Sequence, residues 1–161
     1  MTPAAATLDR IDRKILDILQ REGRIAITEL AQRVGLSTSP CSERVKRLEK
    51  SGVITGYHAR VSPEALGKTL LVFVEIKLSA KSGEVFDKVR NELLHMPEVL
   101  ECHLVSGDFD YLVKARLRGM GEYRHLLGSI LQKIPASASA DSRSYVVMEE
   151  IKETLALPLD R

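Results

Sequence analysis

Side chains able to bind an anionic polymer gather between residues 37 and 50, where hydroxyl, basic and acidic groups recur. Lys and Arg donate charge-assisted hydrogen bonds to phosphate oxygens, and Ser, Thr and Glu can bond to the edges of bases. At about 100° per residue, Cys41, Val45 and Leu48 share one helical face. The segment therefore predicts a helix that packs on one side and can contact duplex DNA on the other. The residues assigned to this contact are Ser37, Thr38, Ser39, Ser42, Glu43, Arg44, Lys46, Arg47 and Lys50.

Roles within this helix follow from how a recognition helix docks, since its N-terminal part contacts most of the bases in the major groove. Lys50 should therefore meet the DNA backbone, and Arg47 either the backbone or the groove. Glu43 and Arg47 are four residues apart and could instead pair with each other on a solvated face. The residues assigned to the groove floor are Ser39, Ser42, Glu43 and Lys46.

A glycine turn precedes the helix and gives the two helices the spacing of a helix-turn-helix. Apolar residues of segment 30–34 form one face, and Gly35 follows at once. Glycine tolerates the left-handed backbone that ends a helix. Pro40 fits the first turn of the next helix, with Ser39 as the predicted N-cap and Ser37 as the alternative.

A further helix and a connecting segment complete this first module. Residues 8–19 carry apolar side chains at helical spacing, and Asp9 can cap this helix with Asp12 three residues on. Residues 53–61 are rich in β-prone side chains and predict either a short wing or a connecting strand. Residues 62–67 break the pattern and predict a hinge.

The second half of the chain alternates strand and helix patterns. Two such βαβ units form a ferredoxin-like βαββαβ sandwich, with an antiparallel sheet and both helices on one face. The fold class is therefore α+β, with a three-helix winged helix-turn-helix before the sandwich. The predicted elements are a strand at 69–78, a helix at 82–95, strands at 99–106 and 111–117, a helix at 121–134 and a strand at 142–152.

The far face of the sheet predicts self-association. Leu71, Phe73, Leu104 and Val147 are expected to alternate with the core-facing residues and to need cover, which we assign to a second subunit. A dimer also suits DNA, because one helix-turn-helix buries little surface and a two-fold pair reads two half-sites. The predicted organisation is a flexible tail at 1–7, the DNA-binding domain at 8–61, a hinge at 62–68, the ferredoxin-like domain at 69–154 and a C-terminal tail at 155–161.

Charge and composition agree with this division and exclude several classes. The net charge is only +2, but residues 1–60 hold 11 Lys or Arg against 7 Asp or Glu, so the basic excess lies with the helix-turn-helix. No apolar run reaches the length of a membrane span, and no signal peptide is visible, so we expect a cytoplasmic protein. Cys41 and Cys102 are predicted to be small buried hydrophobes.

Catalytic and metal motifs are missing from the sequence. The four histidines show no ligand spacing with acidic or thiol neighbours, and no nucleophile motif or phosphate loop is present. We therefore expect no enzyme activity, no metal and no cofactor.

The motifs together resemble those of the Lrp/AsnC family of bacterial transcription regulators, closest to its leucine-responsive branch. The resemblance spans nearly everything from residue 8 onward, and the Ser/Ala-rich loop 135–142 departs from the family pattern. It implies dimers and often octamers that wrap DNA, and an amino-acid effector, leucine foremost, that changes assembly and promoter activity. The segments that carry it are 8–16, 34–41, 43–49, 70–76, 101–114 and 145–152.

The corner at 106–111 is the predicted effector site. A glycine corner can expose backbone N–H groups to a carboxylate, and Asp110 or Asp108 can accept from an ammonium. A Gly-Asp pair is also a common hairpin turn, so the motif alone is ambiguous. With the resemblance, which links Leu104, Asp110, Met120, Val146 and Val147 to leucine response, the assigned effector residues are Leu104, Ser106, Gly107, Asp108, Asp110, Met120, Val146 and Val147.

Two other functions compete with an amino-acid-gated regulator. An architectural protein that organises DNA with little sequence preference would use the same helix-turn-helix. An enzyme acting on amino acids would need a nucleophile–base pair or a metal cluster, which the sequence lacks.

Overall fold

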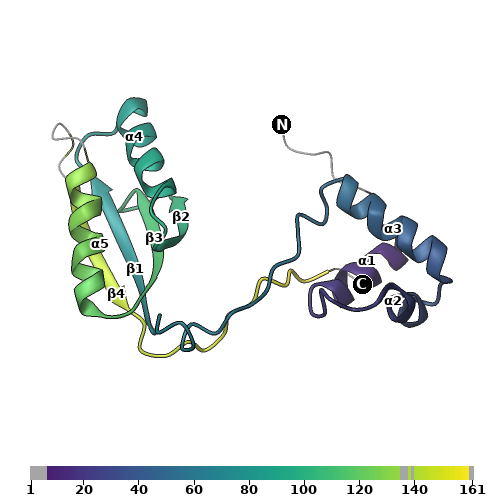
Figure 1. Ribbon diagram of the computed structural model, residues 1–161. Helices are drawn as coiled ribbons and strands as arrows, with labels where there is room; N and C mark the ends of the chain where they lie inside the picture. The colour runs from purple at the N-terminus through teal and green to yellow at the C-terminus, as the bar shows by residue number, and fades with distance from the viewer. Residues whose placement is uncertain (1–6, 135–137, 139, 160–161) are drawn as a thin grey trace. The chain divides into compact units, whose positions relative to one another are not determined.

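The computed structural model describes residues 7–134, 138 and 140–159, and its contacts divide the chain into two compact units (Figure 1). Of the described residues, the first unit comprises 7–60 and 152–159, and the second lies between Val61 and Ile151. The expected tail at 1–7 lies outside the described residues except for Thr7. The segment from Lys152, which the sequence divided between a domain and a tail, groups with the first unit.

Three helices form the first unit: α1 (Arg10–Leu19), α2 (Ile27–Val34) and α3 (Thr38–Lys50). The predicted cap of α1 is confirmed, because Asp12 N–H donates to Asp9 Oδ1 at 2.8 Å and Asp9 N–H donates to Asp12 Oδ2 at 3.3 Å. Gly35 ends α2 with a φ of 77°, a left-handed backbone conformation that residues with a Cβ rarely adopt. The buried core of the unit consists of Ile15, Leu16, Leu30, Ala31, Val34, Cys41 and Leu48.

Helix α3 begins at the earlier of the two predicted N-caps. Its N-cap is Ser37, the alternative, and not Ser39, and the Ser37 side chain makes no capping hydrogen bond. Pro40 then lies in the first turn, where backbone N–H groups have no partner within the helix, so its missing N–H costs nothing. The first bond of the helix runs from Cys41 N–H to the Ser37 carbonyl at 3.2 Å.

Two extended segments accompany these helices. Residues 53–61 contain no strand, so the predicted wing or connecting strand is absent from this part of the chain. The C-terminal segment is held at Gln20, whose side-chain amide donates to the Leu157 carbonyl at 3.1 Å and accepts from the Leu157 N–H at 2.6 Å. Leu159 packs against the core of the unit.

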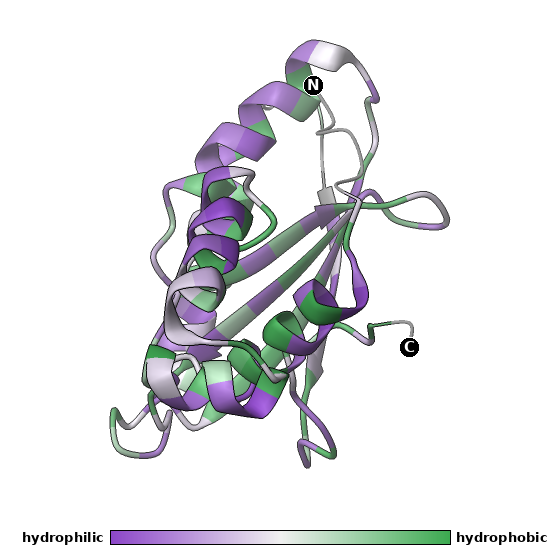
Figure 2. Ribbon diagram, turned by 90° about the vertical axis from the view of Figure 1, so that its right-hand side faces the viewer, coloured by the Kyte–Doolittle hydropathy of each residue, from purple (hydrophilic) through white to green (hydrophobic). Residues whose placement is uncertain are grey.

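The second unit is a four-stranded antiparallel sheet in the order β2-β3-β1-β4, with two helices, which confirms the ferredoxin-like arrangement (Figure 1). Alternate residues of β1, from Val72 to Leu78, face a core that also contains Val89 of α4 and Ile130 of α5, so both helices cover one face. The alternation of apolar and polar residues along the strands is visible in Figure 2. The bounds are β1 (Leu70–Leu78), α4 (Gly83–Leu94), β2 (Val99–Leu104), β3 (Tyr111–Leu117), α5 (Met120–Lys133) and β4 (Ala140–Val146).

Strand β4 differs from the prediction at both ends. It runs antiparallel to β1, with Val146 opposite Val72, and β1 ends only two residues further on at Leu70. The ladder therefore has no partner for residues up to 152, where the strand was expected to end. Part of the Ser/Ala-rich loop, 135–137 and 139, lies outside the described residues.

The edge strand β2 corrects two further expectations. An irregularity between Val99 and Glu101 shifts its register, so Leu104 pairs with the core residue Tyr111 and lies on the helix-facing side of the sheet. It was expected on the opposite face. Cys102 is exposed and not buried, because β2 has a neighbour on one side only.

Candidate nucleic-acid interface and ligand-binding region

One face of α3 is packed and the other is open. Cys41 and Leu48 are buried in the core of the first unit, as their spacing predicted. Because a helix turns about 100° per residue, the hydroxyl and charged side chains between them point outward. Their placement fits a helix that can enter a groove. The exposed candidates are Ser37, Thr38, Ser39, Glu43, Lys46, Arg47 and Lys50, while Ser42 and Arg44 are half-buried.

The two arginines of α3 are bound to the N-terminal end of α1. Arg44 Nη1 donates to Asp9 Oδ2 at 2.6 Å and to Asp12 Oδ1 at 2.9 Å. Arg47 Nη2 donates to both Asp12 oxygens, at 2.7 and 2.6 Å. Arg47 therefore pairs with Asp12 and not with Glu43, the pairing that the sequence had left open.

Sequence reasoning treated Asp12 only as a cap. The signal that could have found its second role is the i,i+3 spacing of Asp9 and Asp12 on one helix and of Arg44 and Arg47 on another. The hydrogen bond from the Asp12 N–H, followed by the bond from Arg44, lowers the pKa of Asp9. The bonds to Asp9 and then to Asp12 raise the pKa of Arg44. Both groups thus stay charged over the physiological range.

Tyr57 follows α3 and contacts its last turn. Its hydroxyl donates to Glu49 Oε1 at 2.9 Å. Burial, with the Glu49 carboxylate next, raises the pKa of Tyr57 to about 12. The phenol therefore remains a neutral hydrogen-bond donor to the Glu49 carboxylate at neutral pH.

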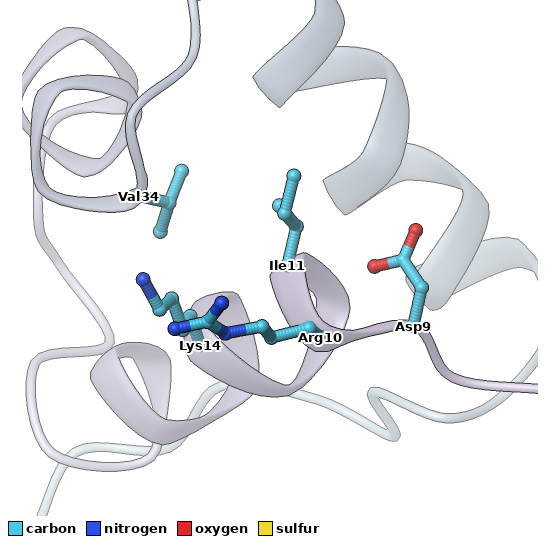
Figure 3. A pocket seen from close by; sticks show the side chains of 5 residues that line it. All are labelled: Asp9, Arg10, Ile11, Lys14 and Val34. Carbon is cyan, nitrogen blue, oxygen red and sulfur yellow. The ribbon is translucent and has the colours of Figure 1, made fainter. Parts of the chain in front are cut away.

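An open hollow of about 500 Å³ lies beside α1 in the same unit (Figure 3). Its apolar lining comes from Ile11 and Val34, and Arg10 and Lys14 supply cationic side chains. Asp9 also lines it, but the Asp9 carboxylate is already bound to Arg44. Within the described residues, no group of three or more His, Cys, Asp or Glu side chains could hold a metal ion, and no helix has the length and apolar character to cross a bilayer.

The predicted effector corner contains one buried and several exposed groups. Gly107 has a φ of 138°, and Ser106 and Asp108 on either side are exposed. Asp110 is only 5% exposed. Its Oδ2 accepts from the Leu78 N–H at 2.8 Å, and its Oδ1 pairs with Lys81 Nζ at 2.8 Å. Asp110 thus holds the corner to the end of β1.

Burial tends to raise the pKa of Asp110, but the ammonium of Lys81 and the N–H of Leu78 outweigh it, and the net effect is a lowered pKa. The carboxylate is therefore charged at neutral pH.

A single chain keeps the assigned effector residues in two groups. Leu104 and the corner adjoin Tyr111, which pairs with Ile76. Met120 follows the other end of β3. Val146 lies in β4, at the opposite edge of the sheet from β2, and pairs with Val72 of β1. The two pairing positions on β1, Ile76 and Val72, are about 13 Å apart along the strand at 3.3 Å per residue, and the spacing between strands adds to this distance. One small ligand cannot touch both groups within one chain.

Comparison with known families places each unit. Residues 8–55 match a model described as winged helix-turn-helix DNA-binding. Residues 71–157 match the Lrp/AsnC ligand binding domain. Fold, exposed helix and matched domains together define a DNA-binding transcription regulator with a ligand-binding domain, and not an enzyme.

Full-length relatives give the family. The chain is 52% identical over 147 residues to the leucine-responsive regulatory protein of Escherichia coli K12, covering 91% of this chain and 88% of that protein. It is 53% identical over 152 residues to the leucine-responsive regulatory protein of Haemophilus influenzae, covering 94% and 90%. The chain belongs to the Lrp/AsnC family, as its motifs had indicated.

Solved structures agree with the fold. A transcriptional regulator from Neisseria meningitidis in complex with L-methionine has a TM-score of 0.89 and 36% identity, covering 96% of this chain and 98% of that one. A feast or famine regulatory protein from M. tuberculosis complexed with L-methionine has a TM-score of 0.79 and 34% identity, covering 90% and 95%. The protein is accordingly an amino-acid-responsive transcription regulator close to the leucine-responsive members of its family.

Proposed function

We propose that α3 docks in the major groove of duplex DNA. The observation that carries this proposal is the exposure of its hydroxyl and basic side chains while Cys41 and Leu48 anchor the opposite face. Residues of the first two turns would contact base edges, since this part of a recognition helix reaches deepest. Lys50 in the last turn would meet phosphate. The full proposed interface is Ser37, Thr38, Ser39, Ser42, Glu43, Arg44, Lys46, Arg47 and Lys50.

In this proposal the regulator is a homo-oligomer, in which the chain forms dimers and the dimers assemble further into octamers. On the sheet face opposite the helices, Phe73 pairs with Tyr145, which is 48% exposed. Met148 and Ile151, just after β4, are 94% and 83% exposed. Burying such apolar surface favours association. Sedimentation at several protein concentrations tests it, and a monomer throughout would refute it.

The effector is a small apolar amino acid, leucine foremost. The support comes from relatives that are leucine-responsive regulatory proteins and from similar structures in complex with L-methionine. Because one chain separates the corner from Met120 and Val146, an effector that touches both groups needs two copies of the chain. A polar contribution is also required, since burying a leucine-sized side chain yields only about 1.5–3 kcal/mol. The proposed contacts are Leu104, Ser106, Gly107, Asp108, Asp110, Met120, Val146 and Val147.

The decisive experiment titrates the protein with each of the twenty amino acids by calorimetry and repeats sedimentation with each. Heat and a change of assembly with leucine or methionine, together with changed DNA affinity, are expected. No heat and no change of assembly with any amino acid would overturn the effector proposal while leaving DNA binding intact. We propose the cytoplasm as its compartment, because the similar regulators are bacterial proteins and bacterial DNA lies in the cytoplasm.

A competition experiment distinguishes a sequence-preferring regulator from the alternative, an architectural protein that organises DNA. A fixed duplex that the protein has selected from a random pool is challenged with random duplex at constant salt. A specificity ratio well above one is expected for a regulator. A ratio near one would favour the architectural role.

A further inference from the structure

Four charged side chains join α1 to α3, and we call Asp9, Asp12, Arg44 and Arg47 the carboxylate–guanidinium cluster. Asp12 lies at its centre and is 1% exposed. It accepts from Arg44 at 2.9 Å and from Arg47 at 2.7 and 2.6 Å. A buried carboxylate needs such partners, because desolvating an unpaired charge is costly.

Arg47 is held at one end only. Its side chain remains 58% exposed, although Nη2 bonds to both oxygens of Asp12. A guanidinium carries five N–H donors in a rigid plane. Within the part of the chain that the structure describes, Nη2 is the only nitrogen of Arg47 with a hydrogen-bond partner. Its Nε and Nη1 are therefore available to a further acceptor. Arg44 differs, because its side chain is 26% exposed and its Nη1 bridges Asp9 and Asp12.

The place of Arg47 on α3 suggests which acceptor it would meet. It lies in the third turn, beyond the N-terminal part of the helix that contacts bases, and its neighbour Lys50 is exposed in the last turn. The acceptors available there on duplex DNA are phosphate oxygens, which planar guanidinium groups bind well.

We propose that Asp12 is a positioning residue for DNA binding: it holds the guanidinium of Arg47 in place so that the remaining donors grip a backbone phosphate. This inference rests on the proposed docking of α3. An arginine loses side-chain freedom when it binds, and a bond already formed in the free protein removes part of that loss.

Simple electrostatics predicts the opposite sign, which makes the proposal testable. Neutralising Asp12 removes a negative charge from the side of the domain that meets a polyanion and releases Arg47. Charge alone would then tighten binding to any duplex. Positioning predicts weaker binding, by about three- to tenfold for one side chain that must now be ordered.

The experiment compares Asp12→Asn with Asp17→Asn, its matched control. Asp17 is an exposed carboxylate of the same helix that pairs only locally with Arg21, at 2.7 Å, so the charge change is equal. The probe is a duplex that the parent protein has selected from a random pool. Binding of this duplex by the parent tests the docking proposal first, and the variants test only Asp12. We expect Asp12→Asn to bind about three- to tenfold more weakly than Asp17→Asn, and equal or tighter binding would overturn the proposal.

A double-mutant cycle separates positioning from a general effect on the fold. In an Arg47→Ala protein, Asp12→Asn should change DNA affinity by less than about twofold, because the group that it positions is gone. The same three- to tenfold loss in that background would show that Asp12 acts through the fold and would refute the proposal. Thermal unfolding of each variant establishes that it is folded at the assay temperature.

A further variant keeps the test decisive if Asp12→Asn does not fold. Arg47→Lys retains the charge but not the planar set of donors, and a lysine cannot hold Asp12 and a phosphate with the same geometry. We expect its affinity to fall to within about twofold of Arg47→Ala. Affinity at the level of the parent would mean that only the charge at this position matters.

Discussion

Replacing Asp110 tests whether the corner at 106–111 is a structural joint as well as a proposed ligand contact. Asp110 Oδ2 accepts from the Leu78 N–H at 2.8 Å, in a bond buried from solvent, and Oδ1 pairs with Lys81 at 2.8 Å. Its backbone accepts from the Val105 N–H and donates to the Ile76 carbonyl, both at 2.9 Å. The backbone bonds survive a substitution, and the two side-chain bonds do not.

The expected loss follows from these two bonds. Asp110→Ala leaves the buried N–H of Leu78 unsatisfied and removes a charge-assisted bond, which together cost about 2–4 kcal/mol of unfolding free energy. The pair with Lys81 adds at most about 1 kcal/mol, because the Lys81 side chain is 52% exposed. Asp110→Asn keeps an acceptor for Leu78 and should lose only about 1 kcal/mol.

Urea unfolding of the intact protein, at one protein concentration and neutral pH, measures these differences. The pKa of Asp110 is lowered from 3.8, so its charged form stabilises the fold above about pH 4 and this contribution is lost as the pH falls further. The difference between parent and Asp110→Ala should therefore shrink in acid. An Asp110→Ala protein within about 0.5 kcal/mol of the parent at pH 7 would refute the reasoning from the Leu78 bond.

The same two variants address the proposed ammonium acceptor. If Asp110 binds the effector, both lose the response of DNA binding to leucine, and Asp110→Asn does so with a nearly intact fold. Retention of the leucine response in a folded Asp110→Asn protein would assign the acceptor to another group.

Three further changes probe other regions. Lys50→Ala should weaken DNA binding and make the slope of log K against log salt less steep by about 0.9, since one phosphate contact is lost; an unchanged slope would remove Lys50 from the interface. Gln20→Ala removes both bonds to the Leu157 backbone and should cost the first unit about 1 kcal/mol in urea unfolding; no change would show that this amide does not hold the C-terminal segment. The backbone N–H and then the side chain of Arg118 hold the pKa of Glu122 at about 2, below its ordinary 4.5. The charged carboxylate therefore stabilises the fold above about pH 4.5, and this stabilisation is lost as the pH falls towards 2. Glu122→Gln should flatten the acid dependence of the unfolding free energy in that range, and a profile like that of the parent would contradict this.

Much of the fold could be predicted because it is encoded locally. The spacing of Cys41 and Leu48 identified the buried face of α3, and the i,i+3 pair Asp9 and Asp12 identified the cap of α1. Alternation along β1 identified its core-facing side. The sequence preferred Ser39 over Ser37 as the N-cap of α3, and the structure has Ser37; the sequence did not separate the two because Pro40 is compatible with any position in the first turn of a helix.

Features that depend on register were less accessible. Alternation alone placed Leu104 on the wrong face, since an irregularity in β2 reverses the side chains that follow it. Burial of Cys102 was expected from its apolar neighbours, but β2 is an edge strand, and strand order is a property of the whole sheet.

The sequence by itself determined the periodic faces, the caps, the glycine turn and the family motifs, because these depend on residues within a few positions of one another. Only the tertiary structure decided that Asp12 binds Arg47, that Gln20 holds Leu157, and that the assigned effector residues stand in two separate groups. Such pairs are far apart along the chain. Charged and amide side chains have several acceptable partners nearby, and packing of the backbone decides which partner comes within hydrogen-bonding distance.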